Sequence, residues 1–127
     1  MEHKFSFEKL NVWETARQLT KTIYIITKEQ YPDAEKFGLV SQMRRAAVSV
    51  CSNIAEGTSR TSTKDQAHFY QISYSSLMEL LNQCIISNDL NYISEETLVA
   101  IRAKVEKTGN MLNSLRKSCL NKQHPKK

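Results

Sequence analysis

The sequence predicts an all-α protein, an antiparallel up-and-down four-helix bundle. Its 127 residues include only 3 Gly and 2 Pro, too few for the many turns of a β fold. Apolar residues make up 40% of the chain and recur at spacings of three and four, which indicates helices. Four such segments follow one another with short connections, and helices joined in this way pack best as antiparallel neighbours.

The length suits a single domain, and we expect residues 1–120 to form the bundle and residues 121–127 a flexible basic tail. No apolar run approaches the roughly 20 residues that span a bilayer, and the first residues do not resemble a signal peptide. We therefore expect a cytoplasmic protein without membrane contact. The three cysteines are widely separated within apolar helical patterns, so we expect reduced core residues.

The first two helices are predicted from their apolar stripes. The first runs from about Phe7 to Gln30, and Tyr31-Pro32-Asp33 ends it. The second runs from about Ala34 or Glu35 to Glu56, where Gly57 offers a natural C-cap. Its seam alternates steps of three and four residues through Val40, Met43, Ala47, Val50 and Ile54.

The last two helices are predicted from their start signals as well as their spacing. Ser62-Thr63-Lys64-Asp65 resembles a capping box and opens a helix that continues to about Asn88. Ser94-Glu95-Glu96 opens the fourth helix, which runs to about Leu120. Gly109 weakens that helix without breaking it.

The third helix carries two apolar lines where one bundle core should need one. One line comprises Phe69, Ile72, Ser73, Ser76, Leu80 and Cys84, and the other comprises Tyr70, Tyr74, Met78, Leu81 and Ile85. A wide core-facing arc with tyrosine hydroxyls reaching water would explain both. Packing of the second line against another subunit is the alternative that we favour, so we expect a homo-oligomer.

The sequence contains no local signature of an enzyme or a metal site. No pair of His or Cys residues has a metal-ligand spacing, and the three glycines stand alone, so there is no phosphate-binding loop. His68 reads as an ordinary surface or boundary residue rather than a general base. We expect a non-enzymatic protein without a metal or another cofactor.

A basic strip on the first helix is the first candidate binding feature. Arg17, Lys21, Tyr24 and Lys28 recur at four, three and four residues, beside the core stripe. With a formal net charge of +5, such a strip can follow a phosphate backbone and stack on an unpaired base. A solvated helix flank explains the same pattern.

The second candidate feature is the segment from Gln42 to Gly57. Arg45, Ser49, Ser52 and Glu56 fall opposite its core line. Ser49, Ser52 and Asn53 are mediocre helix formers, which suggests tight packing or a polar contact with a partner, although a solvated face also explains them. Glu56 near the helix C-terminus opposes the helix dipole and suggests a nearby cation, either Arg60 or Arg45 of a neighbouring subunit.

The order of several blocks resembles a known family. These blocks are residues 7–16 (FEKLNVWETA), 37–39 (FGL), 42–49 (QMRRAAVS) and 52–57 (SNIAEG). They are similar to the bacterial four-helix-bundle proteins encoded in 23S ribosomal RNA intervening sequences. The resemblance implies a ring-like homopentamer and no established enzyme activity. It extends to the accessory protein of diversity-generating retroelements, a basic pentamer that binds nucleic acid and reverse transcriptase.

The resemblance places Arg44, Arg45, Asn53, Glu56 and Gly57 in the family's central motif, where they could serve binding or assembly. The leading hypothesis is a homo-oligomer, of five subunits by resemblance, that binds RNA or DNA. A protein–protein adaptor that does not contact nucleic acid is the alternative. The candidate nucleic-acid-binding residues are Arg17, Lys21, Tyr24, Lys28, Arg44, Arg45, Arg60 and Lys64. The candidate interface residues are Ser49, Asn53, Glu56, Tyr70, Tyr74, Met78 and Leu81.

Overall fold

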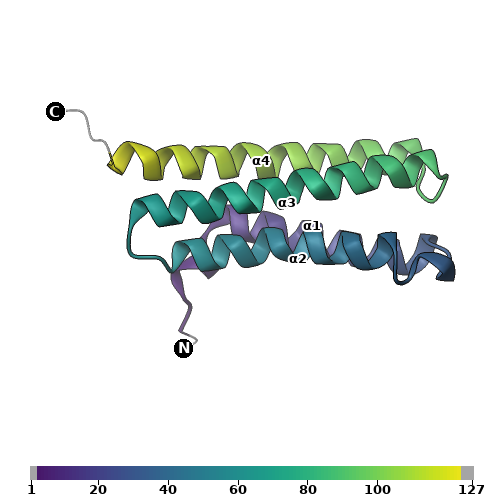
Figure 1. Cartoon of the computed structure of the whole chain (residues 1–127), viewed down its shortest axis with the longest axis horizontal. Helices are drawn as coiled ribbons and strands as arrows, with labels where there is room; N and C mark the ends of the chain where they lie inside the picture. Colours follow the sequence, from purple (N-terminus) through teal and green to yellow (C-terminus); the bar gives the residue numbers. More distant parts are fainter. Residues whose placement is uncertain (1–2, 124–127) are drawn as a thin grey trace.

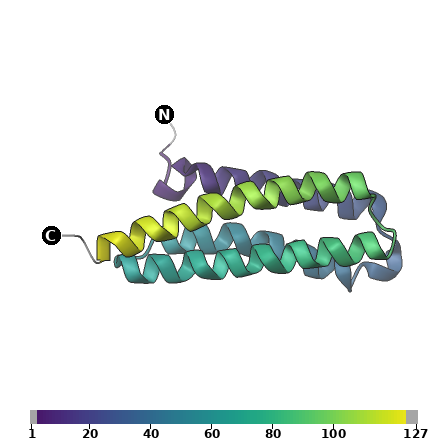
Figure 2. The same ribbon diagram turned by 90° about the horizontal axis from the view of Figure 1, so that it is seen from above.

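The computed structural model describes residues 3–123, and in that range it is all-helical, which confirms the predicted fold class. The four main helices are α1 (Asn11–Gln30), α2 (Leu39–Thr58), α3 (Thr63–Asp89) and α4 (Glu95–Gln123). They run alternately up and down, so α1 begins at the end of the bundle where α4 ends (Figure 1). The view from above shows the same antiparallel order (Figure 2). None of the helices within residues 3–123 is both long and apolar enough to cross a bilayer.

The start of the first helix differs from the prediction. A short 3-10 helix covers Ser6–Lys9, and α1 begins only after Leu10, whose backbone is extended. With this break, the ring of Phe7 packs edge-on against Trp13, with 5.1 Å between the ring centroids. The predicted continuous helix from Phe7 is therefore two pieces.

The second helix also begins later than predicted. Asp33–Glu35 form a separate 3-10 helix, and α2 starts at Leu39. The Glu35 carboxylate accepts the Leu39 N–H at 3.2 Å and the Tyr92 hydroxyl at 2.9 Å. A Cβ atom at Gly38 would lie 2.6 Å from Glu35 Oε1, so a side chain at position 38 would displace this cap.

The prediction that Gly57 caps α2 is wrong. The helix continues through Gly57 to Thr58, and the described glycines have no positive φ. Gly57 is buried instead, because α3 passes close to it: an added Cβ would lie 2.8 Å from Phe69 Cβ and 3.0 Å from Tyr70 Cε1. The residue is needed for close helix packing and not for turning the chain.

The start signals of the last two helices are confirmed. Ser62 Oγ accepts the Asp65 N–H at 3.0 Å, and Ser94 Oγ accepts the Thr97 N–H at 3.1 Å. The fourth helix extends to Gln123, three residues beyond the predicted end of the domain at Leu120. Residues 124–127 of the predicted tail, and residues 1–2, lie outside the described range.

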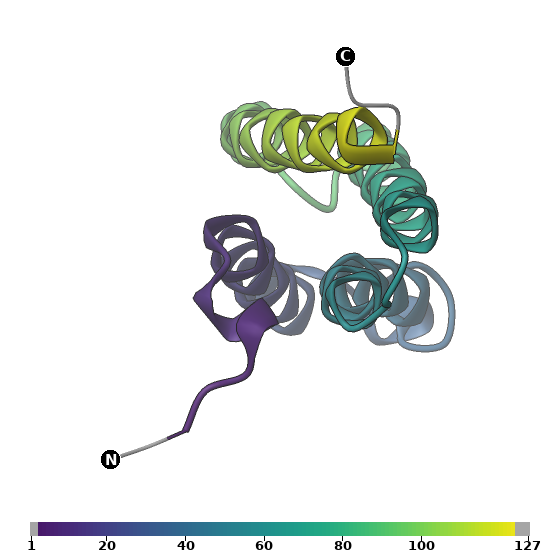
Figure 3. The ribbon, with the colours of Figure 1, turned by 90° about the vertical axis from the view of Figure 1, so that its left-hand side faces the viewer.

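The two apolar lines of the third helix border one wide buried arc. Seen end-on, α3 lies between α2 and α4 and packs against both (Figure 3). Leu77, which belongs to neither line, is fully buried between them. Tyr70 was predicted as an interface residue, but it is only 3% exposed and its hydroxyl bonds Thr58 Oγ1 at 2.8 Å. That prediction is wrong for Tyr70, because its ring packs in the core of the single chain.

Burial of weakly acidic groups in the core predicts a loss of stability at high pH. Burial raises the pKa of the Cys84 thiol from 9.0 to about 12 and the pKa of the Tyr31 hydroxyl from 10.0 to about 12. From about pH 9 to 12 for Cys84, and from about pH 10 to 12 for Tyr31, the unfolded chain therefore releases a proton that the folded chain keeps. In its window each group lowers the free energy of unfolding by up to about 1.4 kcal/mol per pH unit. Urea titrations at pH 8.5 and 10.5 measure this fall, and we expect a smaller fall for Cys84→Ala. Equal stability at the two pH values would contradict the prediction.

Candidate nucleic-acid interface

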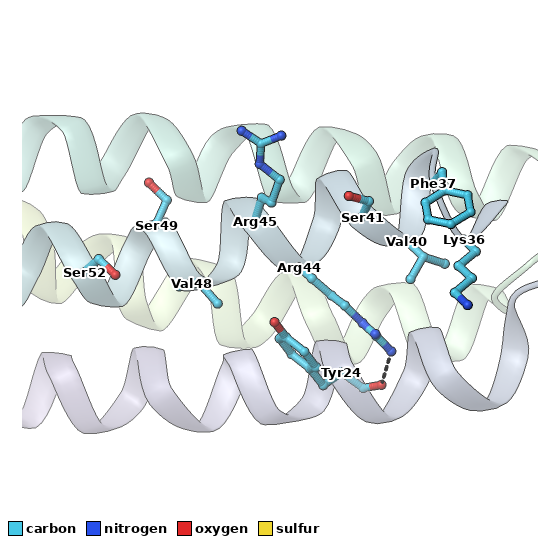
Figure 4. A pocket seen from close by; sticks show the side chains of 10 residues that line it. All are labelled: Tyr24, Lys36, Phe37, Val40, Ser41, Arg44, Arg45, Val48, Ser49 and Ser52. Atoms are coloured by element: carbon cyan, nitrogen blue, oxygen red, sulfur yellow. Dashed lines mark hydrogen bonds between the residues drawn. The ribbon is translucent and has the colours of Figure 1, made fainter.

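An open groove runs along the outer face of α2, with α1 on one side (Figure 4). Its volume is about 800 Å³. The described residues that line it are Tyr24, Lys36, Phe37, Val40, Ser41, Arg44, Arg45, Val48, Ser49 and Ser52. This set contains three cations and two aromatic rings but no carboxylate, so the groove is suited to an anionic ligand with apolar faces.

The helical repeat explains how these residues come together. Because Met43, Ala47 and Val50 face the core, Ser41, Val48 and Ser52 point outward along α2. The hydroxyl oxygen of Thr20 on α1 lies 3.2 Å from the Ala47 carbonyl oxygen and 3.4 Å from Cys51 Sγ, and these contacts mark the register of the two helices. This register places Tyr24, one turn further along α1, beside Arg44.

Arg44 crosses from α2 to α1. Its Nε donates to Thr27 Oγ1 at 2.9 Å, and its Nη2 donates to the Tyr24 carbonyl at 3.4 Å. The guanidinium carbon lies 4.6 Å from the centroid of the Tyr24 ring, a cation–π distance. Arg44 therefore has a structural role, and its cation is held in one orientation at the edge of the groove.

Arg45 and Lys36 supply the other charges of the groove. Within residues 3–123, neither has a carboxylate partner within the 4.0 Å ion-pair distance. The Arg45 side chain projects on the opposite side of α2 from Arg44 (Figure 4). Lys36 Nζ lies 5.6 Å from the centroid of the neighbouring Phe37 ring. Both cations are available to a phosphate group.

The structure brings together three of the predicted nucleic-acid-binding residues, Tyr24, Arg44 and Arg45. Lys21 and Lys28 are exposed and lie one turn on either side of Tyr24, so they flank the groove without lining it.

The other predicted cations lie apart from the groove. Arg17 pairs with Glu14 at 3.3 Å. Arg60 pairs with Glu56 at 3.5 Å and stacks on Phe69, which confirms the Arg60 alternative for the cation beside Glu56. Lys64 is exposed at the start of α3. Arg60 and Lys64 lie beyond the C-terminal end of α2, whereas Lys36 lies before its N-terminal end. Neither Arg60 nor Lys64 lines the groove.

Five of the seven predicted interface residues fall into two groups. Tyr74, Met78 and Leu81 line one shallow depression of about 270 Å³ between α3 and α4, and Met78 is 36% exposed. Ser49 and Asn53 instead find polar partners inside the chain: the Ser49 and Ser76 hydroxyls are 2.8 Å apart, and Asn53 Nδ2 donates to Ser49 Oγ at 3.0 Å. These contacts support the tight-packing explanation for Ser49 and Asn53.

Sequence reasoning missed Lys36 and Phe37. They lie between the 3-10 helix and α2, where no helical spacing marks them as members of a face. Phe37 is 89% exposed, the largest exposure among the exposed large apolar residues described. The adjacent positive charge and aromatic ring were visible in the sequence, but their position beside Tyr24 and Arg44 depends on the fold.

No group of three or more His, Cys, Asp or Glu side chains within residues 3–123 is arranged to hold a metal ion.

Comparison with known proteins supports the fold and gives a family. A crystal structure of a protein of unknown function from the S23 ribosomal protein family, from Bacteroides thetaiotaomicron VPI-5482, superposes with a TM-score of 0.77 at 20% sequence identity, covering 84% of this chain and 95% of that one. A comparison with curated proteins found no match. The profile of the family described as 23S rRNA-intervening sequence protein matches residues 8–114. The chain therefore belongs to the 23S rRNA-intervening sequence protein family.

Proposed function

We propose that this protein is a non-enzymatic, cytoplasmic homo-oligomer that binds RNA or DNA through the groove on the outer face of α2. The observation that carries the proposal is the composition of the groove: three cations and two aromatic rings, with no carboxylate among the ten described lining residues. Phosphate contacts from Lys36 and Arg45 supply affinity without strong sequence preference, and Lys21 and Lys28 extend the positive surface along α1.

The assembly part of the proposal rests on a different surface. The depression at Tyr74, Met78 and Leu81 exposes apolar side chains between α3 and α4, away from the groove. A second subunit that covers this surface leaves the groove open to nucleic acid. Five subunits is the number that the family resemblance implies, and light scattering on the purified protein measures it. A monomer at micromolar concentration would contradict this part.

Salt dependence tests the binding part. We expect the logarithm of the association constant for a labelled 20-nucleotide RNA or DNA, followed by fluorescence anisotropy, to fall linearly with the logarithm of salt concentration. Lys36→Gln and Arg45→Gln should each reduce that slope by about 0.7 to 1, because each removes one phosphate contact. Lys107→Gln is the matched control, since Lys107 is exposed on α4, a helix that contributes no residue to the groove.

Two results would contradict the binding part. One is an affinity that does not depend on salt. The other is equal weakening by Lys107→Gln and Arg45→Gln, which would indicate that only net charge matters. If no nucleic acid binds at all, the adaptor alternative becomes the better explanation of the exposed Phe37.

A further inference from the structure

We infer that the groove selects single-stranded over duplex nucleic acid, because Phe37 and the Tyr24–Arg44 pair are built to stack on unpaired bases. This inference rests on the proposed function and specifies the ligand of the same site. It depends on the immobilisation of Arg44, the exposure of Phe37, and the surface that lies between them.

The Tyr24–Arg44 pair is a preorganised stacking surface. Two hydrogen bonds and the contact with the Tyr24 ring hold the Arg44 guanidinium before any ligand arrives. Thr27, which accepts one of these bonds, is itself fixed because its hydroxyl donates to the Ile23 carbonyl at 2.7 Å. The Tyr24 ring is still 41% exposed. A base that stacks here therefore does not have to immobilise a flexible arginine, which removes part of the entropic cost of binding.

Phe37 is a second stacking surface at the end of the groove where α2 begins. A phenyl ring left 89% exposed gives up most of the favourable free energy that burial of such a side chain contributes. A nucleic-acid base has an apolar face that can cover this ring, and the adjacent Lys36 ammonium can meet the phosphate attached to the same nucleotide.

The surface between the two rings is suited to a strand whose bases are turned toward the protein. Val40, Ser41 and Val48 form it, and none of them is large or charged. Lys36 and Arg45 lie at its edges. A single strand can place bases on the rings and phosphates on these cations at once. In a duplex the base faces are already stacked, so contact with the rings would require unstacking, which is unfavourable at every base step.

The test compares one labelled 12-nucleotide single strand with its duplex by fluorescence anisotropy at the same salt concentration. Phe37→Ala should weaken single-strand binding by about fivefold to 150-fold, the effect of losing one stacked base, and should change duplex binding by less than about twofold. Phe37→Trp should retain single-strand affinity. Phe37→Leu should not, because leucine keeps an apolar surface without a π face. Phe5→Ala is the matched control, since Phe5 is 65% exposed and precedes α1, at the other end of the bundle.

The outcomes separate this inference from the proposed function. If Phe37→Ala weakens single-strand and duplex binding equally, or if Phe37→Leu binds like the unchanged protein, base stacking is refuted while nucleic-acid binding stands. If the unchanged protein binds neither oligonucleotide, the proposed function fails and the inference fails with it. Because Phe37 is almost fully exposed, none of these substitutions should disturb folding.

Discussion

Replacing Gly57 by valine is expected to lower the free energy of unfolding by about 3 kcal/mol. Even the first carbon of a side chain at this position would lie 2.8 Å from Phe69 Cβ, an atom that cannot swing aside without moving the backbone of α3. The same carbon would lie 3.0 Å from Cε1 of the Tyr70 ring, which is buried and hydrogen-bonded to Thr58, and valine adds two methyl groups to this crowded position. Overpacking of this kind costs about 1–3 kcal/mol and occasionally more. Urea denaturation followed by circular dichroism, at one protein concentration, measures the change.

Gly109 provides the matched control, since it is a second buried glycine within a helix. An alanine Cβ at this position would lie 3.3 Å from Tyr74 Cε2, and the Tyr74 ring is only partly buried and can shift. Alanine also favours the helix by about 1 kcal/mol over glycine. Gly109→Ala should therefore leave stability unchanged or raise it slightly. If Gly57→Val and Gly109→Ala changed the free energy of unfolding equally, the close approach of α3 to Gly57 would not explain the destabilisation by valine.

Replacing Tyr70 by alanine is expected to cost about 3–5 kcal/mol of unfolding free energy, because it removes a large ring from the core and leaves a cavity. It also leaves the Thr58 hydroxyl without its partner on α3. Tyr70→Phe separates the two effects, since it keeps the ring and loses only the hydrogen bond, at about 1 kcal/mol. The measurement is the same urea titration.

Comparison with Met78→Ala distinguishes a core role of Tyr70 from a role in subunit assembly. Met78 is 36% exposed in the single chain, so its truncation should change subunit stability little and should weaken assembly if its surface is an interface. Light scattering at several protein concentrations follows assembly. A Tyr70→Ala variant that folds with unchanged stability but fails to assemble would reverse our assignment of the two residues.

Much of the fold could be predicted because local rules determine it. The hydroxyls of Ser62 and Ser94 cap the helices that follow them, and a serine before an amphipathic segment is a signal that the sequence alone provides. The role of Gly57 was predicted wrongly because the sequence shows a glycine near a helix end but does not show that a neighbouring helix approaches it. Tyr70 was misplaced because the number of helices that surround α3 sets the width of its buried arc, and this number is a property of the tertiary fold.

The candidate site could be predicted only in part, for a related reason. Tyr24 was found because it lies on a regular basic strip, Arg45 because it falls opposite the core line of its helix, and Arg44 through the family resemblance. The stacking of Arg44 on Tyr24 joins residues that are 20 positions apart, and it depends on the register of α1 against α2. Phe37 lies outside any helical period, so only its exposure in the folded chain identifies it.

The order in which the helices pack has a consequence for folding kinetics. Helices that are consecutive in the chain make most of the contacts, and the first and last helices contribute fewer to each other. Such a chain has low contact order, because each hairpin can form before the next is added, and folding within microseconds to milliseconds is expected. The contact between α1 and α4 joins the most distant parts of the chain and closes last. Amide hydrogens along that seam should exchange before those of α3, which is enclosed by neighbours on two sides.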